Sequence, residues 1–179
     1  IEPRAKILVV SQANVAVDNV LRGLLKAGCP NSMILRCGWN GKIAEDIRPV
    51  SYETKLQSYL DQVGQKSSDG DLTAMTWLDI LGHSSQKNAD LGNLLMLSHQ
   101  IIGATCVGLA QKNIGLENAT FDLVIVDEAG TALMPEVLIP MNKAKKLILI
   151  GDHKQLPPVI HPALYDPELI ELDDRNYFK

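Results

Sequence analysis

The sequence predicts an α/β fold in which a parallel sheet is covered by helices on both faces. Apolar runs of strand-forming residues recur along the chain, and the runs 123–126 and 147–150 contain no polar alternation. Such runs are typical of strands buried on both faces. The two runs nearest the start of the chain, 6–10 and 33–37, are separated by a helical pattern. Strand, helix and strand at this spacing imply a right-handed parallel crossover. A chain of 179 residues can bury the core of one such domain.

The first part of the chain contains one strand–helix–strand unit. Residues 6–10 form the first predicted strand and residues 33–37 the second. Between them, apolar residues recur at helical spacing and form one stripe. Asn14 is a candidate N-cap of this helix, and Gly28 with Pro30 ends it. The residues of the stripe are Val17, Val20, Leu21, Leu24 and Leu25.

The middle of the chain, from about residue 40 to 98, predicts a helical insertion outside the sheet. Residues 52–63 place their apolar side chains on one helical face, and the Ser-Ser-Asp-Gly run 67–70 interrupts that pattern. Apolar residues within 72–81 and 91–95 indicate two further helices. The sheet resumes with strands at 101–105, 123–126 and 147–150.

Composition limits the kinds of function that the chain can have. Its net charge is −4, so it has no overall basic surface for nucleic acid, and any such binding must be local. The cysteines, Cys29, Cys37 and Cys106, have neither metal-site spacing nor an even number, which fits free thiols in a reducing compartment. No signal peptide or membrane-spanning run is present. We therefore expect an intracellular, cytoplasmic protein, and a nuclear location stays open as the alternative.

Polar side chains follow two successive predicted strands. Asp127 and Glu128 end the first, and Gly151, Asp152 and Gln155 follow the second. Carboxyl ends of parallel strands meet at one edge of an open sheet, where such folds bind ligands. Carboxylates there suit Mg²⁺ and the handling of an attacking water. The alternative for the two acids alone is a favourable position at a helix N-terminus.

Four segments, in order, resemble motifs of superfamily 1 helicases. Residues 6–18 resemble motif Ia, residues 101–110 the following nucleic-acid-contacting motif, and residues 121–130 and 147–158 motifs II and III. In their order and their residues, these motifs most resemble those of the branch that includes the nonsense-mediated-decay RNA helicase and senataxin. The resemblance implies a RecA-like P-loop NTPase fold, with ATP and Mg²⁺ as cofactors, single-stranded RNA or DNA as partner, and 5′-to-3′ travel.

The resemblance also implies roles at the nucleotide. Asp127 matches the acid that holds Mg²⁺, and Glu128 matches the base that orients the attacking water. Gln155 matches a residue that contacts the γ-phosphate, and its amide can both donate and accept. Asp152 supports this group or forms a turn. Gly151 permits the tight exit from its strand.

On the nucleic-acid side, the resemblance implies a path for a single strand. Ser11, Gln12, Asn14 and Thr105 match its positions, and such hydroxyls and amides contact phosphate and sugar without reading sequence. Helix capping is a second, compatible role for Ser11 and Asn14. Asp18 lies in the same motif, where we expect a structural hydrogen-bond partner.

No phosphate-binding loop of the Gly-x-x-x-x-Gly-Lys-Ser/Thr pattern occurs in the chain. The run 38–42 contains a Gly-Lys pair but lacks the first glycine and the hydroxyl, and reads as an ordinary loop. We therefore expect residues 1–179 to be part of a first RecA-like domain, without ATP hydrolysis on its own. Alternatives are an ATPase that remodels protein–nucleic acid complexes without unwinding and a non-catalytic interaction module. For Trp39 and Trp77 we expect core packing in preference to base stacking.

Overall fold

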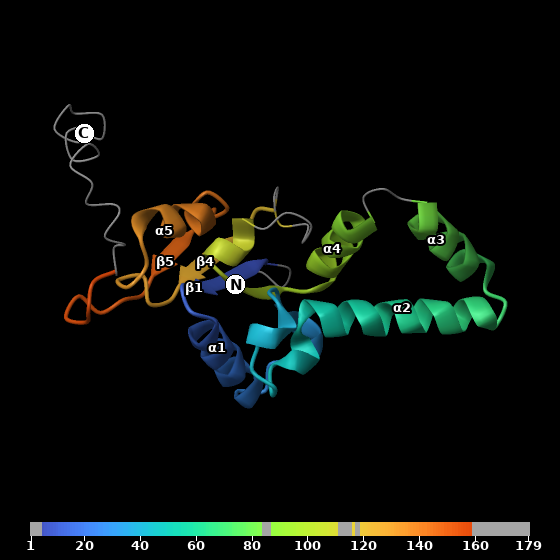
Figure 1. Ribbon diagram of the computed structural model, residues 1–179, viewed down its shortest axis with the longest axis horizontal. Helices are drawn as coiled ribbons and strands as arrows, with labels where there is room; N and C mark the ends of the chain where they lie inside the picture. Colours follow the sequence, from blue (N-terminus) through green and yellow to red (C-terminus); the bar gives the residue numbers. More distant parts are fainter. Residues whose placement is uncertain (1–4, 84–86, 111–115, 117–118, 159–179) are drawn as a thin grey trace, which may run out of the picture.

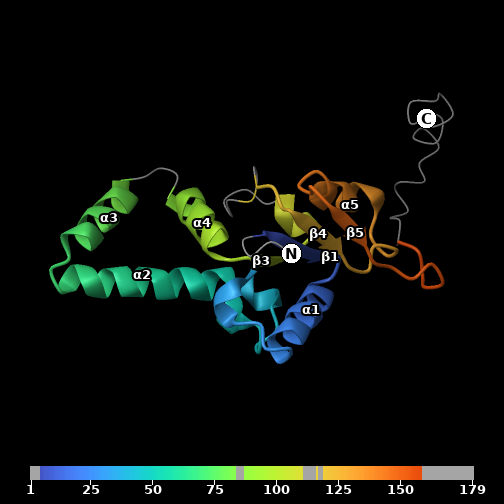
Figure 2. The same ribbon diagram turned by 180° about the vertical axis from the view of Figure 1, so that it is seen from behind.

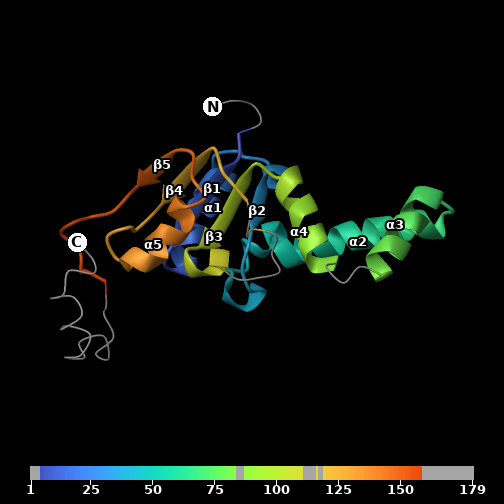
Figure 3. The same cartoon turned by 90° about the horizontal axis from the view of Figure 1, so that it is seen from above.

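The computed structural model describes residues 5–83, 87–110, 116 and 119–158, and its centre is a five-stranded parallel sheet. Figure 1 shows β1, β4 and β5 side by side, and Figure 3 shows the full order across the sheet, β2-β3-β1-β4-β5. The strands are β1 (Ile7–Ser11), β2 (Ile34–Arg36), β3 (Ile101–Thr105), β4 (Leu123–Val126) and β5 (Leu147–Leu149). The predicted parallel sheet and all five predicted strands are confirmed.

Helices cover both faces of the sheet, as the sequence predicts. Helix α1 (Asn14–Lys26) lies on one face, and α5 (Met134–Met141) with the short 3₁₀ helix η4 (Val107–Ala110) on the other (Figures 1 and 2). A glycine allows α1 to approach closely, because a Cβ on Gly103 would lie 2.7 Å from a methyl carbon of Leu21.

Each face of the sheet has its own buried core. On the α5 face, alternate strand residues such as Leu8, Val10 and Ile102 pack together and are fully buried. On the α1 face, Val17, Leu21 and Ile34 form a smaller cluster. The alternation of faces along each strand therefore accounts for the continuous apolar runs, because both sides need apolar residues.

The predicted insertion is helical, but it begins later than expected. Helices α2 (Tyr52–Ser68), α3 (Leu72–His83) and α4 (Lys87–Ser98) extend away from one end of the sheet (Figures 1 and 2). Residues 43–50 instead belong to the domain core: Ile43, Ile47 and Val50 are buried under α1. The 3₁₀ helix η2 (Asn40–Lys42) precedes this stretch, and the 3₁₀ helix η3 (Arg48–Val50) ends it. The next residue, Ser51, forms an isolated parallel bridge with Arg36. The helices that extend from the sheet thus begin at residue 52, later than the expected start at about residue 40. The spacing of apolar residues in a loop does not show whether the loop is buried.

No helix within the described part of the chain is both long and apolar enough to cross a lipid bilayer.

Candidate nucleotide and nucleic-acid site

The predicted nucleotide residues follow β4 and β5, which are neighbours in the sheet. The Ile150 amide donates to the Val126 carbonyl and the Ala129 amide donates to the Ile150 carbonyl, each at 2.8 Å, so the two chains remain paired beyond the strands. Asp127 and Glu128 leave β4 where Gly151 and Asp152 leave β5. The structure thus brings together the two polar groups that the sequence assigns to one edge.

The carboxylates of Asp127 and Glu128 are half-buried and available for a ligand. Within the described residues, neither has a hydrogen-bond or ion-pair partner. Two adjacent hard-oxygen donors fit a magnesium ion, which prefers one or two carboxylates together with water and phosphate oxygens. No cluster of three metal-ligating side chains occurs among the described residues, so the remaining ligands would be water and phosphate.

Glycines bring the two loops into close contact. A Cβ on Gly151 would lie 2.8 Å from the Gly130 amide nitrogen, and one on Gly130 would lie 3.4 Å from the Asp152 carbonyl oxygen. A side chain at Gly151 would therefore separate the loops after β4 and β5. The φ angle of Gly151 is not positive, so its backbone does not require glycine. Glycine is needed here because the two loops approach so closely, and not because of a tight exit from the strand as the sequence suggests.

Asp152 and Gln155 form a turn beyond β5. The Oδ1 atom of Asp152 accepts the Lys154 amide at 2.9 Å, and its Oδ2 atom lies 3.4 Å from Nε2 of Gln155. Both side chains are exposed. Asp152 therefore has the turn role that the sequence leaves open, and the same carboxylate contacts the amide of Gln155.

The predicted strand-path residues gather around the neighbouring pair β1 and β3. Ser11 and Thr105 are paired in register across these strands. The Ser11 hydroxyl is buried and has no hydrogen-bond partner in the described part of the chain. The Thr105 hydroxyl oxygen accepts the Gly108 amide at 3.0 Å, which leaves its own proton available for donation.

Asn14 and Gln12 have contacts that the sequence does not predict. Asn14 is not the N-cap; Ala13 occupies that position without a side-chain bond. The Asn14 amide oxygen instead accepts from Nη2 of Arg36 at 2.9 Å. Gln12 is exposed, and its Nε2 atom donates to Oε2 of Glu136 in α5 at 3.3 Å. The proposed nucleotide residues and the proposed strand-path residues follow adjacent strands, β4 and β1. The Asp127 amide donates to the Val10 carbonyl at 2.8 Å.

Arg36 is a buried residue that the sequence reading overlooked. Its side chain is fully buried, and Nε donates to Oδ1 of Asp18 at 2.7 Å. The second Asp18 oxygen accepts the Ala44 amide at 2.8 Å, so Asp18 is the structural partner that the sequence predicts. A charge inside the apolar run 33–37 was the available signal, since a buried charge requires a partner.

Two cysteines and two lysines outside the candidate site have structural roles. Cys37 and Cys106 are buried free thiols, and burial raises the pKa of Cys37 to about 12 and that of Cys106 to about 11. Lys145 pairs with Asp122 at 2.7 Å, and Lys143 donates to the Leu116 carbonyl at 2.6 Å. These lysines lie near the beginning of β4, opposite the carboxylates.

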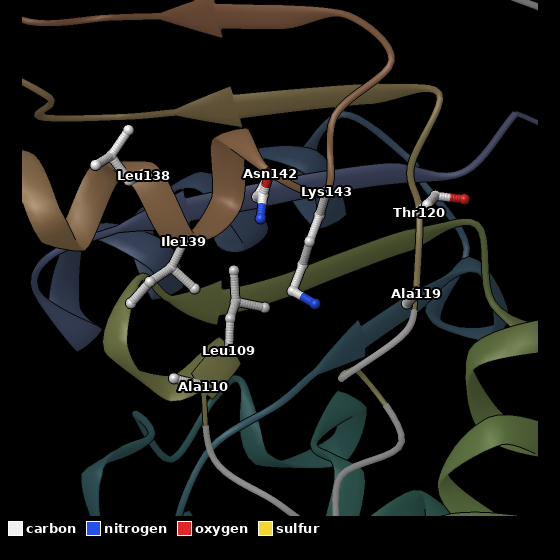
Figure 4. Close-up of a pocket in the computed structure, with 8 residues that line it drawn as sticks. All are labelled: Leu109, Ala110, Ala119, Thr120, Leu138, Ile139, Asn142 and Lys143. Atoms are coloured by element: carbon white, nitrogen blue, oxygen red, sulfur yellow. The ribbon is translucent and has the colours of Figure 1, made fainter.

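A separate pocket of about 620 Å³ lies between η4 and α5. In Figure 4 the side chains of Leu109, Ile139 and Lys143 point into it. Its lining contains none of the predicted site residues, so it is distinct from the carboxylate edge.

The sequence of the chain is similar to a known family and to several helicases. Residues 76–163 match a family described as an AAA domain. The chain is 32% identical over 159 residues to mouse 5'-3' DNA helicase ZGRF1, covering 87% of this chain and 8% of that protein. It is 32% identical over 168 residues to Regulator of nonsense transcripts 1 of Dictyostelium discoideum, covering 87% of this chain and 12% of that protein. It is 30% identical over 165 residues to the ATP-dependent helicase NAM7 of Saccharomyces cerevisiae, covering 87% of this chain and 16% of that protein. The chain thus spans a small part of the length of these relatives.

Proposed function

Since this chain is part of an AAA domain of the superfamily 1 helicase type, we propose that it supplies the ATP-hydrolysing and strand-contacting edge of an ATP-driven helicase. In this proposal Asp127 holds Mg²⁺ and Glu128 orients the water that attacks the γ-phosphate. Bound Mg·ATP supplies the phosphoryl group; this chain positions the water and the metal. The relatives named above include both a DNA helicase and a regulator of nonsense transcripts, so RNA and DNA are both open as substrates.

One observation carries the proposal: two unpaired carboxylates and a Gly-Asp-x-x-Gln segment lie at adjacent strand ends. A carboxylate with a purely structural role would have a hydrogen-bond or ion-pair partner. Here Asp18, Asp122 and Glu136 have such partners, whereas Asp127 and Glu128 have none within the described residues. Their oxygens therefore remain free for a metal ion and a water molecule.

Substitution of Glu128 in the full-length protein tests the proposal. We expect Glu128→Gln to stop ATP turnover while ATP binding persists, because the amide keeps the shape but cannot accept the proton of the attacking water. Glu53→Gln, on the exposed side of α2, is the matched control and should leave turnover unchanged. Normal turnover by Glu128→Gln would remove this residue from the assigned role.

Gln155 is proposed to link the nucleotide to the strand path. Coupling between the two ligands is typically about 1–3 kcal/mol, or roughly 5- to 150-fold in affinity. We expect Gln155→Ala to reduce the change in strand affinity that a non-hydrolysable ATP analogue causes, and Thr105→Ala to weaken strand binding with and without the analogue. Fluorescence anisotropy of a labelled oligonucleotide measures both. An unchanged nucleotide effect in Gln155→Ala would exclude the sensor role, and an unwinding assay separates a helicase from a remodelling ATPase.

A further inference from the structure

Trp39 lies at the strand-path edge and is 68% exposed, contrary to the expected core packing. It follows the end of β2 by three residues. The Cys37 amide donates to the Gly103 carbonyl at 2.7 Å, which holds this segment against β3. Two residues further along β3 is Thr105, the partner of Ser11. Trp39 therefore leaves the sheet at the same end as the proposed strand-path residues.

One face of the Trp39 ring rests on a glycine. A Cβ on Gly41 would lie 2.8, 2.8 and 3.0 Å from three consecutive atoms of the six-membered ring, Cη2, Cζ2 and Cε2. Near-equal distances to three consecutive atoms place Gly41 over the ring face and not at its edge. Because the residue is mostly exposed, the opposite face is open to solvent.

The loop that carries Trp39 is anchored at both ends by the same buried ion pair. At its beginning, Nη1 of Arg36 donates to the Cys37 carbonyl at 2.6 Å. At its end, the Ala44 amide donates to Asp18. Arg36 also holds Asn14, a proposed strand-path residue. An exposed indole on a loop fixed in this way loses little conformational freedom when a ligand binds.

We propose that Trp39 stacks on one base of a single strand bound at this edge, with Arg36 as the residue that positions it. The inference rests on the proposed function. Stacking on an aromatic face tolerates every base, which suits a motor that must pass over any sequence. Arg36 acts only through the loop and Asn14, and makes no contact with the strand itself.

An oligonucleotide without bases separates stacking from backbone contacts. Full-length protein is titrated into labelled oligo(dT) and into an abasic oligonucleotide of equal length, and affinity is measured by anisotropy. We expect Trp39→Ala to weaken oligo(dT) binding at least about fivefold, the lower end of what loss of a base–aromatic stack costs. Binding of the abasic strand should not change. Trp39→Phe should retain most of the oligo(dT) affinity, and oligo(U) should behave as oligo(dT) does.

Displacing the ring without removing it provides a second variant. Gly41 has no positive φ, so Gly41→Ala fits the backbone but pushes the indole from its seat. We expect a smaller loss of oligo(dT) affinity than in Trp39→Ala, again with no loss on the abasic strand. Gly64→Ala, in an open position of α2, is the matched control and should leave both affinities unchanged.

The outcomes distinguish this inference from the proposed function. Equal losses on oligo(dT) and on the abasic strand would show a structural role for Trp39 and overturn the inference. Unchanged oligo(dT) binding by Trp39→Ala would also overturn it, and either result leaves the helicase proposal standing. If the unsubstituted protein bound no single strand, the proposed function would fail, and the inference with it.

Discussion

A single buried charge, Arg36, connects the beginning of α1, the end of β2 and the loop that follows it. Its partners are Asp18, Asn14 and the Cys37 carbonyl, and both members of the ion pair are almost completely inaccessible to solvent. Removing one member leaves the other buried without compensation, which typically costs about 3–5 kcal/mol.

We therefore expect Arg36→Met to lower the free energy of unfolding by an amount in that range, measured by urea denaturation. The double variant Arg36→Met/Asp18→Leu should be less destabilised than Arg36→Met, since it leaves no unpaired charge. Arg22→Met breaks the ion pair with Asp46 at the surface and should have a much smaller effect. Equal effects of Arg36→Met and Arg22→Met would contradict the importance of burial.

His99 gives the chain a pH-dependent stability near neutrality. Burial lowers the pKa of His99 below 6.5, and the nearby Lys6 and Lys55 add to this effect, although a hydrogen bond to the Leu95 carbonyl opposes it. The unfolded chain thus binds a proton more readily than the folded chain. The resulting stability is fully present above pH 6.5 and is lost as the pH falls towards the lowered pKa.

We expect the urea midpoint at pH 5.5 to lie below that at pH 7.5 in the unsubstituted chain. The difference should shrink in His99→Gln, which cannot be protonated. The carboxyl groups of Asp46 and Asp122 have pKa values lowered from 3.8 by their cationic partners, so they do not titrate in this window. The same pH dependence in His99→Gln would assign it to another group.

At the scale of elements, the beginning of α5 depends on one carboxylate. The N-cap residue Leu133 has no acceptor in its side chain, but its amide donates to Oε2 of Glu136 at 3.0 Å. The same Oε2 atom also accepts a hydrogen bond from Nε2 of Gln12, which follows β1. Glu136 therefore caps the helix that follows the carboxylate loop and joins it to the strand path.

We expect Glu136→Ala to destabilise the chain by about 1 kcal/mol, the typical cost of a lost helix cap. Glu136→Gln should retain most of the stability because its amide oxygen can still accept from the Leu133 amide. Thermal unfolding followed by circular dichroism measures both variants. Equal loss in the two variants would mean that charge matters more than the hydrogen bond.

Regular elements could be predicted from the sequence because their signal is local. Apolar runs fixed all five strands, and helical spacing fixed α1 and the three insertion helices. The proximity of Asp127 to Gly151 also followed, because parallel strand ends share one edge. Asn14, Trp39 and residues 43–50 were misjudged, since their environment depends on Arg36 and on packing under α1, which are contacts between distant parts of the chain.

At the scale of the whole molecule, β5 is an edge strand of the sheet that the described residues form. Ile148 and Leu149 point to opposite faces of the sheet, yet they are 45% and 52% exposed, and Ile150 is 50% exposed. An apolar edge strand of this kind is a template for pairing with another chain.

We expect the isolated chain of residues 1–179 to associate as its concentration rises, as measured by sedimentation velocity. Leu149→Lys should reduce this association, because charge on an edge strand opposes pairing. Leu72→Lys, at an even more exposed apolar position on α3, is the control and should have less effect. Association that is insensitive to Leu149→Lys but abolished by Leu72→Lys would locate the contact on the insertion.

The backbone at Glu128 has a consequence for how this sequence arose. Its φ angle is +56°, in the left-handed region that costs a residue with a side chain about 1–2 kcal/mol and costs glycine almost nothing. Selection for stability alone would favour glycine or asparagine at this turn. The chain has a glutamate there instead, against the preference of its own backbone. Stability and activity therefore make opposite demands on one residue, and a screen for thermostable variants would tend to discard the carboxylate on which the proposed chemistry depends.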